Sequence, residues 1–108
     1  MIYEWRVYQI VPGKARQLNE RFANHTAALF RKHGMEIVGV WENSVGCATN
    51  TLYYMLGFED AAQRESAWKS FKEDPEWQRV AKESEKDGPL VARERNMILT
   101  PTYYSPMK

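Results

Sequence analysis

The stretch Met1-Ile-Tyr-Glu-Trp-Arg-Val-Tyr-Gln-Ile-Val11 decides the fold: it has the composition of a β-strand and ends at Pro12-Gly13. Side chains alternate between the two faces of a strand. One face carries Tyr3, Trp5, Val7, Gln9 and Val11, and the other carries Ile2, Glu4, Arg6, Tyr8 and Ile10. Both faces hold apolar residues, so we expect this strand to be covered on both sides.

Length and composition indicate one globular domain, residues 1–108, with 44% hydrophobic and 13% aromatic residues. The net charge is +1, and no basic stripe is present, so we expect neither a nucleic-acid partner nor a membrane-surface partner. No apolar run approaches the roughly 20 residues of a membrane-spanning helix. The chain enters its first strand at once, and we expect no signal peptide.

Cys47 is the only cysteine, which excludes an intrachain disulfide and favours a cytoplasmic location. It is either a reactive thiol or an inert loop residue. Cys47 and the two histidines are too far apart in sequence to form a metal-ligand motif, so we predict no metal site.

Residues 14–33 have the period of an α-helix. The positions on its apolar face are Ala15, Leu18, Phe22, His25 and Leu29. Residues 35–43 and 51–58 are two strands joined by a short link, which predicts a hairpin.

The second half of the chain begins with a predicted helix over residues 61–72, with Asp60 as its N-cap and Gln63 as the capping-box partner. Asp74-Pro75-Glu76 starts a further helical segment that ends near 87–88. Residues 90–99 form the last strand, and the polar run Arg93–Asn96 in its middle predicts an edge strand or a bulge.

The order βαββαβ in one antiparallel sheet predicts a ferredoxin-like α+β fold. Two helices would cover one face, and we expect the other face to hold apolar residues from all three early strands. These are Ile2, Tyr8, Ile10, Val38, Val40, Leu52, Tyr54, Leu56 and Phe58. Since a monomer rarely exposes so large an apolar surface, we predict a homodimer with sheet packed against sheet.

Several short motifs, in the right order along the chain, resemble the NIPSNAP family. They are Tyr3-Glu4-Trp5-Arg6-Val7-Tyr8, Val11-Pro12-Gly13-Lys14, Val38-Gly39-Val40-Trp41, Asp74-Pro75-Glu76-Trp77, Ile98-Leu99-Thr100-Pro101 and Ser105-Pro106. The resemblance implies a dimeric α+β barrel, in which two ferredoxin-like subunits pair their sheets. That wider group includes cofactor-independent monooxygenases, isomerases, haem-binding enzymes and proteins of unknown role.

Two classes of function remain open at this point. The first is a small-molecule enzyme of the cofactor-independent monooxygenase or isomerase type, acting on a flat apolar substrate. The second is a non-enzymatic dimeric binding or assembly module. No cofactor is indicated by the sequence itself, and haem remains an alternative only because some proteins of the wider group bind it.

Glu4, Arg6 and Tyr8 share one strand face and are candidate site residues. In the functional interpretation Arg6 holds an anionic group, Tyr8 donates a hydrogen bond, and Glu4 contributes to substrate binding. In the structural interpretation Glu4 and Arg6 form an ion pair that fixes strand register. Tyr54 is a candidate for lining a pocket or for filling the core.

His25 is a candidate general base or haem ligand, or else a histidine bonded at the edge of the apolar stripe. Gly39 and Gly57, if they are cross-strand neighbours under the first helix, would leave a gap beside His25. We expect Trp41 to line that gap and bind substrate.

Overall fold

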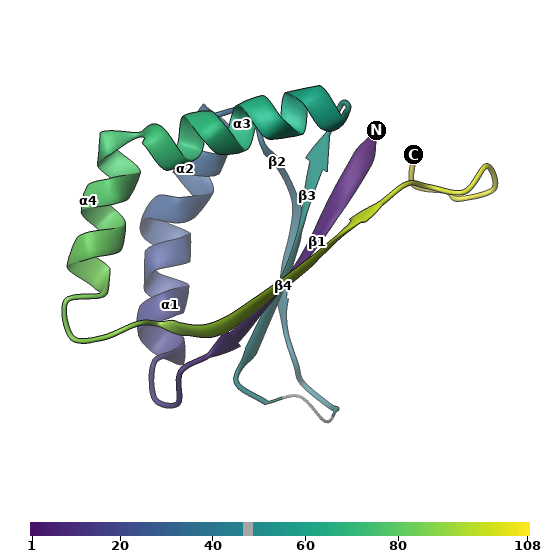
Figure 1. The fold of residues 1–108 in the computed structure, drawn as a ribbon. Coiled ribbons are helices and arrows are strands. Elements are labelled where there is room, and N and C mark those ends of the chain that lie inside the picture. Colours follow the sequence, from purple (N-terminus) through teal and green to yellow (C-terminus); the bar gives the residue numbers. More distant parts are fainter. Residues whose placement is uncertain (47–48) are drawn as a thin grey trace.

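The strands and helices follow one another in the predicted order in the computed structural model, which describes residues 1–46 and 49–108 (Figure 1). The elements are β1 (Ile2–Ile10), α1 (Ala15–Arg21), the π-helical turn η1 (Phe22–Thr26), α2 (Ala27–Lys32), β2 (Glu36–Glu42), β3 (Thr51–Phe58), α3 (Ala61–Glu73), α4 (Pro75–Ser84) and β4 (Val91–Leu99). The sheet order is β2-β3-β1-β4 and every pairing is antiparallel, which confirms the ferredoxin-like α+β fold. Cys47, which the sequence allows as either a reactive thiol or an inert loop residue, lies outside the described residues.

The two helix starts after the hairpin form as their sequences predict. The Asp60 side chain accepts a hydrogen bond from the backbone N–H of Gln63 at 2.8 Å and so caps α3. Asp74 ends α3 and caps α4, where it accepts from the backbone N–H of Glu76 at 2.9 Å, with Pro75 in the first turn.

The helical segment after β1 contains one π-helical turn, which the sequence prediction of a continuous helix missed. The backbone N–H of Ala27 bonds to the carbonyl of Phe22, five residues back. This wider turn shifts the inward face by about one position, so that Thr26 and Phe30 are buried. His25 is exposed, and our prediction that it faces the sheet is wrong.

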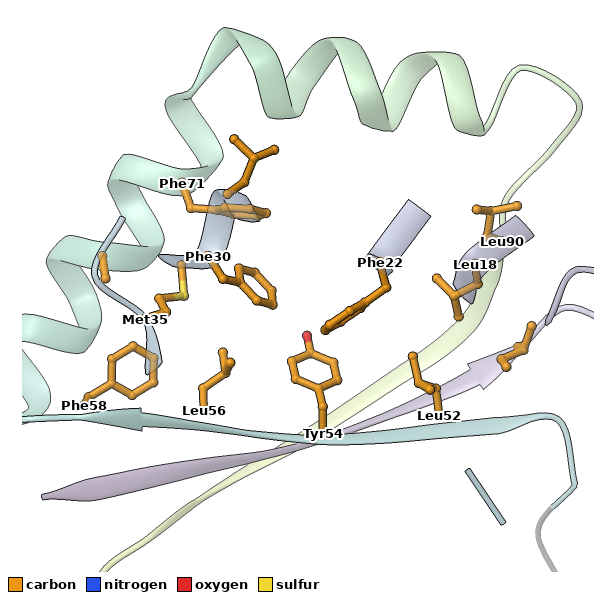
Figure 2. Packing of buried hydrophobic residues seen from close by; sticks show 13 residues of the cluster. Leu18, Phe22, Phe30, Met35, Leu52, Tyr54, Leu56, Phe58, Phe71 and Leu90 are labelled. Atoms are coloured by element: carbon orange, nitrogen blue, oxygen red, sulfur yellow. The ribbon is translucent and has the colours of Figure 1, made fainter. Parts of the chain in front are cut away.

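The hydrophobic core lies between the helices and one face of the sheet (Figures 1 and 2). Alternate residues of β3 point into it: Leu52, Tyr54, Leu56 and Phe58, each 0–1% exposed. From the helices, Leu18, Phe22, Phe30 and Phe71 meet them, as Figure 2 shows. The face that we predicted to be uncovered is therefore the helix-covered face, and that prediction is wrong.

The uncovered face, here called the open face, carries the other alternate residues of the strands. They include Tyr3, Trp5, Val7, Trp41, Tyr53, Met55, Met97 and Leu99, which the strand registers place on one side. Trp5 stacks with Tyr53 and packs against Trp41, with ring centroids 5.7 Å apart in both pairs. The open face is therefore also apolar, and that is why the sequence could not tell which side the helices cover.

β4 is an edge strand, as predicted, and its pairing with β1 shifts register between Gln9 and Ile10. After β4 the chain extends away from the helices to its C-terminus (Figure 1). Within residues 1–46 and 49–108, no helix is long and apolar enough to cross a membrane.

Candidate functional site

Glu4 is a fully buried carboxylate on the helix-covered face, and five hydrogen bonds converge on it. Arg64 of α3 donates two of them, at 2.8 and 3.0 Å, in a bidentate arrangement. Trp68 Nε1 donates at 2.8 Å, Asn96 of β4 at 2.9 Å and Arg6 at 2.9 Å. Glu4 thus ties β1, α3 and β4 together at one point.

These contacts keep Glu4 ionised despite its burial. Burial alone would raise the pKa of Glu4, but hydrogen bonds from Arg64, Trp68 and Asn96 and the charge of Arg6 lower it from 4.5 to about 2. An ionised carboxylate only accepts hydrogen bonds, which matches the five donors around it. The predicted Glu4–Arg6 ion pair is present, and it is part of a larger network.

Arg6 starts a chain of hydrogen bonds that ends at Tyr8. Arg6 Nε donates to the Tyr54 hydroxyl at 2.6 Å, and that hydroxyl donates to the Tyr8 hydroxyl at 2.7 Å. Arg6 Nη2 also points to the Tyr8 hydroxyl, at 3.4 Å. The Tyr8 oxygen therefore accepts twice, and among the described residues its own proton has no acceptor.

The net shift in pKa is upward for both Arg6 and Tyr54. Burial alone would lower the pKa of Arg6, but its contacts with Tyr54 and Tyr8 outweigh it and raise the pKa, so Arg6 is a permanent cation. Burial also raises the pKa of Tyr54 well above its usual range, with Arg6 acting against the shift. Tyr54 thus stays protonated and passes the polarisation from Arg6 to Tyr8.

A cleft of about 740 Å³ opens over this network, between α3, the start of α4 and the edge formed by β1 and β4. We call it the Arg6 cleft. It is lined by Arg6, Tyr8, Arg64, Glu65, Trp68, Lys69, Lys72, Glu73, Trp77, Glu94 and Asn96. Its volume lies within the usual range of small-molecule sites. Aromatic rings and fixed polar groups line it together, which suits a flat ligand with one polar end.

Of the predicted site residues, Arg6 and Tyr8 line this cleft. Glu4 and Tyr54 are buried beneath it and bonded to Arg6, so they position Arg6 and do not contact a ligand themselves. Trp41 does not line the cleft, because it lies on the open face beside Trp5 and Tyr53. His25 does not either: it lines a different cleft, between α1, η1 and α4. That cleft is walled by charged side chains, which do not resemble the apolar slot that haem needs.

The predicted gap under Gly39 and Gly57 is absent. Gly39 pairs with Met55 and Gly57 with Tyr3, so both glycines lie on the open face and not under the first helix. The Trp41 ring covers Gly39 so closely that an added Cβ would lie 2.5 Å from it. The glycine therefore makes room for Trp41 and leaves no ligand pocket.

The residues of the site that come from α3 and β4 were not predicted from the sequence. Arg64 and Trp68 are four residues apart, so they lie on the same side of α3. Glu94 and Asn96 are two apart in β4, so they share the strand face that Arg6 and Tyr8 occupy. The uninterrupted polar run Arg93–Asn96 was the available signal, since it places polar side chains on both faces of β4.

A second polar cluster joins the end of α2 to the junction of α3 and α4. Asp74 accepts from Lys32 at 2.9 Å and from His33 Nε2 at 2.7 Å, and His33 Nδ1 lies 2.5 Å from the Ser70 hydroxyl. Because Asp74 only accepts, His33 Nε2 is the donor to it, and in the neutral tautomer that this leaves, Nδ1 accepts from Ser70. Ser70, His33 and Asp74 then follow one another in the order of a hydrolase triad. Asp74 also caps α4, however, so the cluster holds the end of α2 against the junction of α3 and α4.

Hydrogen bonds from His33, from Lys32 and from the backbone of Glu76 hold the pKa of Asp74 well below its usual range. Across residues 1–46 and 49–108, no group of three or more His, Cys, Asp or Glu side chains is placed to hold a metal ion. The Arg6 cleft itself is lined by guanidinium groups, hydrogen-bond donors, aromatic rings and exposed acids and lysines.

Residues 3–106 match the NIPSNAP family. Human NipSnap homolog 3A is 31% identical over 78 residues, which cover 72% of this chain and 31% of the human protein. This chain thus spans about a third of the length of that curated relative. The crystal structure of an uncharacterised NIPSNAP-like domain protein from Burkholderia xenovorans is 28% identical, with a TM-score of 0.85, and the match covers 97% of this chain and 88% of that one.

A Nitrosomonas europaea protein, assigned provisionally to the antibiotic biosynthesis monooxygenases, has a TM-score of 0.65 at 10% identity, over 95% of this chain and 100% of that one. At this identity the likeness concerns the fold alone. The family match covers nearly the whole chain and agrees with the motifs in the first and second strands. The chain belongs to the NIPSNAP family.

Proposed function

We propose that this chain is a small-molecule enzyme of the cofactor-independent monooxygenase or isomerase type, acting on a flat, largely apolar substrate in the Arg6 cleft. The observation that carries the proposal is the Tyr8 hydroxyl. It accepts from Tyr54 at 2.7 Å and from Arg6 at 3.4 Å and lines the cleft with its own proton free to donate. A donor polarised in this way is suited to a substrate oxygen on which negative charge develops.

Both reaction types need such a donor. An isomerase moves a proton between two substrate carbons through an enol or enolate, whose oxygen Tyr8 would stabilise. A carboxylate of the cleft wall, Glu65, Glu73 or Glu94, would accept the proton from one carbon and return it to the other. In a cofactor-free monooxygenase the substrate carbanion or enolate itself reduces O₂: a methylene carbon and O₂ give a carbonyl group and water. In each case Arg6, held in place by Glu4 and Tyr54, supplies the fixed positive charge that favours the anionic form of the substrate.

The fold comparison supports the oxygenase version, since a neighbour of the same fold is assigned provisionally to the monooxygenases. The aromatic lining supports a flat substrate: the Trp68 ring stacks over the guanidinium of Arg6, with 4.7 Å from its carbon to the ring centroid. A planar ligand would extend this stack beside Trp77.

The test is turnover of a panel of flat hydroxy- and keto-arenes with and without O₂, followed by mass spectrometry. The proposal predicts a product in which two hydrogens are replaced by one oxygen, or a product of unchanged mass with a moved double bond. Tyr8→Phe should lower kcat by about a hundredfold, within the range for loss of one oxyanion donor. Turnover that Tyr8→Phe leaves unchanged would overturn the proposal.

A second candidate function is a dimeric binding or assembly module, and the open face favours it. Trp41, Met97 and Leu99 are 46%, 54% and 38% exposed, and they lie side by side with the Trp5 and Tyr53 rings. We propose that a second copy of this chain covers the face, because a two-fold axis lets one apolar sheet surface pair with itself. The homodimer is compatible with either function.

Analytical ultracentrifugation tests this pairing. Trp41→Glu places a charge in the middle of the open face and should convert dimer to monomer. Val45→Glu is the matched control, because Val45 is 94% exposed and outside the sheet. A monomeric wild-type chain, or a dimer that survives Trp41→Glu, would contradict the pairing. A chain that dimerises but turns over no compound would leave the assembly function as the better account.

A further inference from the structure

We infer that the ligand of the Arg6 cleft is a flat organic anion, such as an aromatic carboxylate or an enolate, and that its negative group binds Arg6 by displacing Glu94. This inference rests on the proposed function, because it names the class of substrate for the same site. Four observations support it: the charge balance at the cleft floor, the position of Glu94, the free donors, and the stacked ring.

The floor of the cleft carries more positive than negative charge. Glu4 is one carboxylate, and it is bonded to two guanidinium groups, those of Arg6 and Arg64. Glu4 is 0% exposed and Arg6 only 13%, so water screens their charges poorly. A buried charge without a counter-ion is costly, so the surplus positive charge at Arg6 calls for a second anion.

In the free protein that second anion is Glu94, and it is poorly placed. Its carboxylate lies 3.5 Å from Arg6 Nη2, against 2.9 Å for the Glu4–Arg6 pair. The Glu94 side chain is 57% exposed, and an ion pair with such an exposed partner contributes little. A ligand anion with better geometry would therefore replace Glu94 at small cost.

The donors for such an anion are already in position. Arg6 uses Nε for Tyr54 and Nη1 for Glu4. Within the described part of the chain this leaves Nη2 with two long contacts, to Tyr8 and to Glu94. The Tyr8 hydroxyl next to it has a proton to donate. Nη2 and the Tyr8 hydroxyl together could hold the two oxygens of a carboxylate, or the one oxygen of an enolate.

The rest of the wall suits the planar part of the same molecule. Trp68 and Trp77 line the cleft, and Trp68 already stacks on the Arg6 guanidinium. Lys69 and Lys72 line the outer wall and add positive charge along the path of entry, where Glu65 and Glu73 also lie. Because the outer wall carries charges of both signs, discrimination between anionic and neutral ligands depends on Arg6 at the floor of the cleft. There Glu94 is the group that competes with the ligand.

The experiment compares two ligands that differ in charge and share a ring system. 1-Naphthoate and 1-naphthylmethanol are titrated into the full chain by calorimetry. We expect naphthoate to bind at least about tenfold more tightly, since one charge-assisted hydrogen bond is worth that factor or more. Glu94→Gln should strengthen naphthoate binding severalfold and leave naphthylmethanol unchanged.

Glu65→Gln is the matched control, because Glu65 is also an exposed acid of the cleft wall and makes no ion pair with Arg6 within the described chain. Glu65→Gln should change the affinities for naphthoate and naphthylmethanol by less than Glu94→Gln changes the affinity for naphthoate. Equal affinity for the two ligands, or equal effects of the two variants, would overturn the inference and leave the proposed function standing. If neither ligand binds and no compound is turned over, both fail.

Discussion

The carboxylate of Glu4 in β1 and the guanidinium of Arg64 in α3 form a bidentate ion pair, with distances of 2.8 and 3.0 Å. The two residues are 60 positions apart, and the pair fixes α3 against the sheet. Trp68, one turn further along α3, bonds to the same carboxylate. The wall and the floor of the Arg6 cleft are thus held in register by one buried acid.

Glu4→Gln should destabilise the fold strongly. The amide keeps the size of the side chain but removes the charge, and two guanidinium groups lose their buried counter-ion. We expect the free energy of unfolding to fall by about 3–5 kcal/mol, the usual cost of breaking a buried ion pair on one side. Urea denaturation measures it, with the exposed Glu83→Gln as the control. A loss no larger than that of the control would contradict the role of Glu4.

The same carboxylate should make stability depend on acid. The pKa of Glu4 is about 2 in the folded chain, against an ordinary value of 4.5 that we take for the unfolded chain. Between pH 4.5 and about pH 2 the unfolded chain binds a proton that the folded chain does not. The contribution of Glu4 to the free energy of unfolding is therefore fully present above pH 4.5 and falls as the pH drops toward 2. The loss should reach about 3 kcal/mol.

Urea denaturation at several values between about pH 5 and pH 2 checks this acid dependence. Asp74, whose pKa is also lowered, contributes a loss of the same sign. The informative quantity is therefore the difference between the wild type and Glu4→Gln, which keeps Asp74. That difference should shrink as the pH falls, and a constant difference would refute the assignment to Glu4.

Tyr54→Phe tests the hydrogen-bond chain to Tyr8. The ring stays in the core, where Tyr54 is 0% exposed, but Arg6 Nε loses its acceptor. We expect a loss of about 1–3 kcal/mol, the cost of leaving a buried donor unpaired. The neighbouring Tyr53 is on the open face, so Tyr53→Phe should stay within about 0.5 kcal/mol of wild type in the same denaturation assay. Equal effects would contradict the network.

The two aspartate caps offer a paired comparison. Asp60→Ala removes the N-cap of α3 and should cost about 1 kcal/mol, as for other caps. Asp74→Ala removes the cap of α4 and also the partners of Lys32 and His33, so it should cost more. Thermal unfolding of the two variants compares their losses of stability. A larger loss for Asp60→Ala than for Asp74→Ala would argue against a role of the Asp74 cluster in holding the helices together.

Local signals predicted the element order and both caps, because each depends on residues only a few positions apart. Asp60 with Gln63 and Asp74 with Pro75 are examples, and the structure has both. Local signals did not predict which face of the sheet the helices cover. Since β1 is apolar on both faces, its alternation could not say which face meets the helices; that choice depends on packing of the whole chain.

The predicted position of His25 was wrong because the helical period changes at η1. An unbroken α-helix would place it in line with Leu18, Phe22 and Leu29, but the turn at η1 adds a residue and moves Thr26 inward. Part of the site was within reach of sequence analysis, since Glu4, Arg6 and Tyr8 alternate on one strand. The polar run of β4 contains Asn96, but its bond to Glu4 could not be predicted, because 92 residues separate the two.

The most direct test of the Arg6 cleft uses the four tryptophans as reporters. Trp68 and Trp77 line the cleft, whereas Trp5 and Trp41 lie on the open face and serve as internal controls. The measurement is the indole N–H spectrum of ¹⁵N-labelled protein during titration with 1-naphthoate. We expect the Trp68 and Trp77 signals to shift while those of Trp5 and Trp41 stay in place. Shifts confined to Trp5 and Trp41 would contradict this expectation and place the ligand on the opposite side of the sheet.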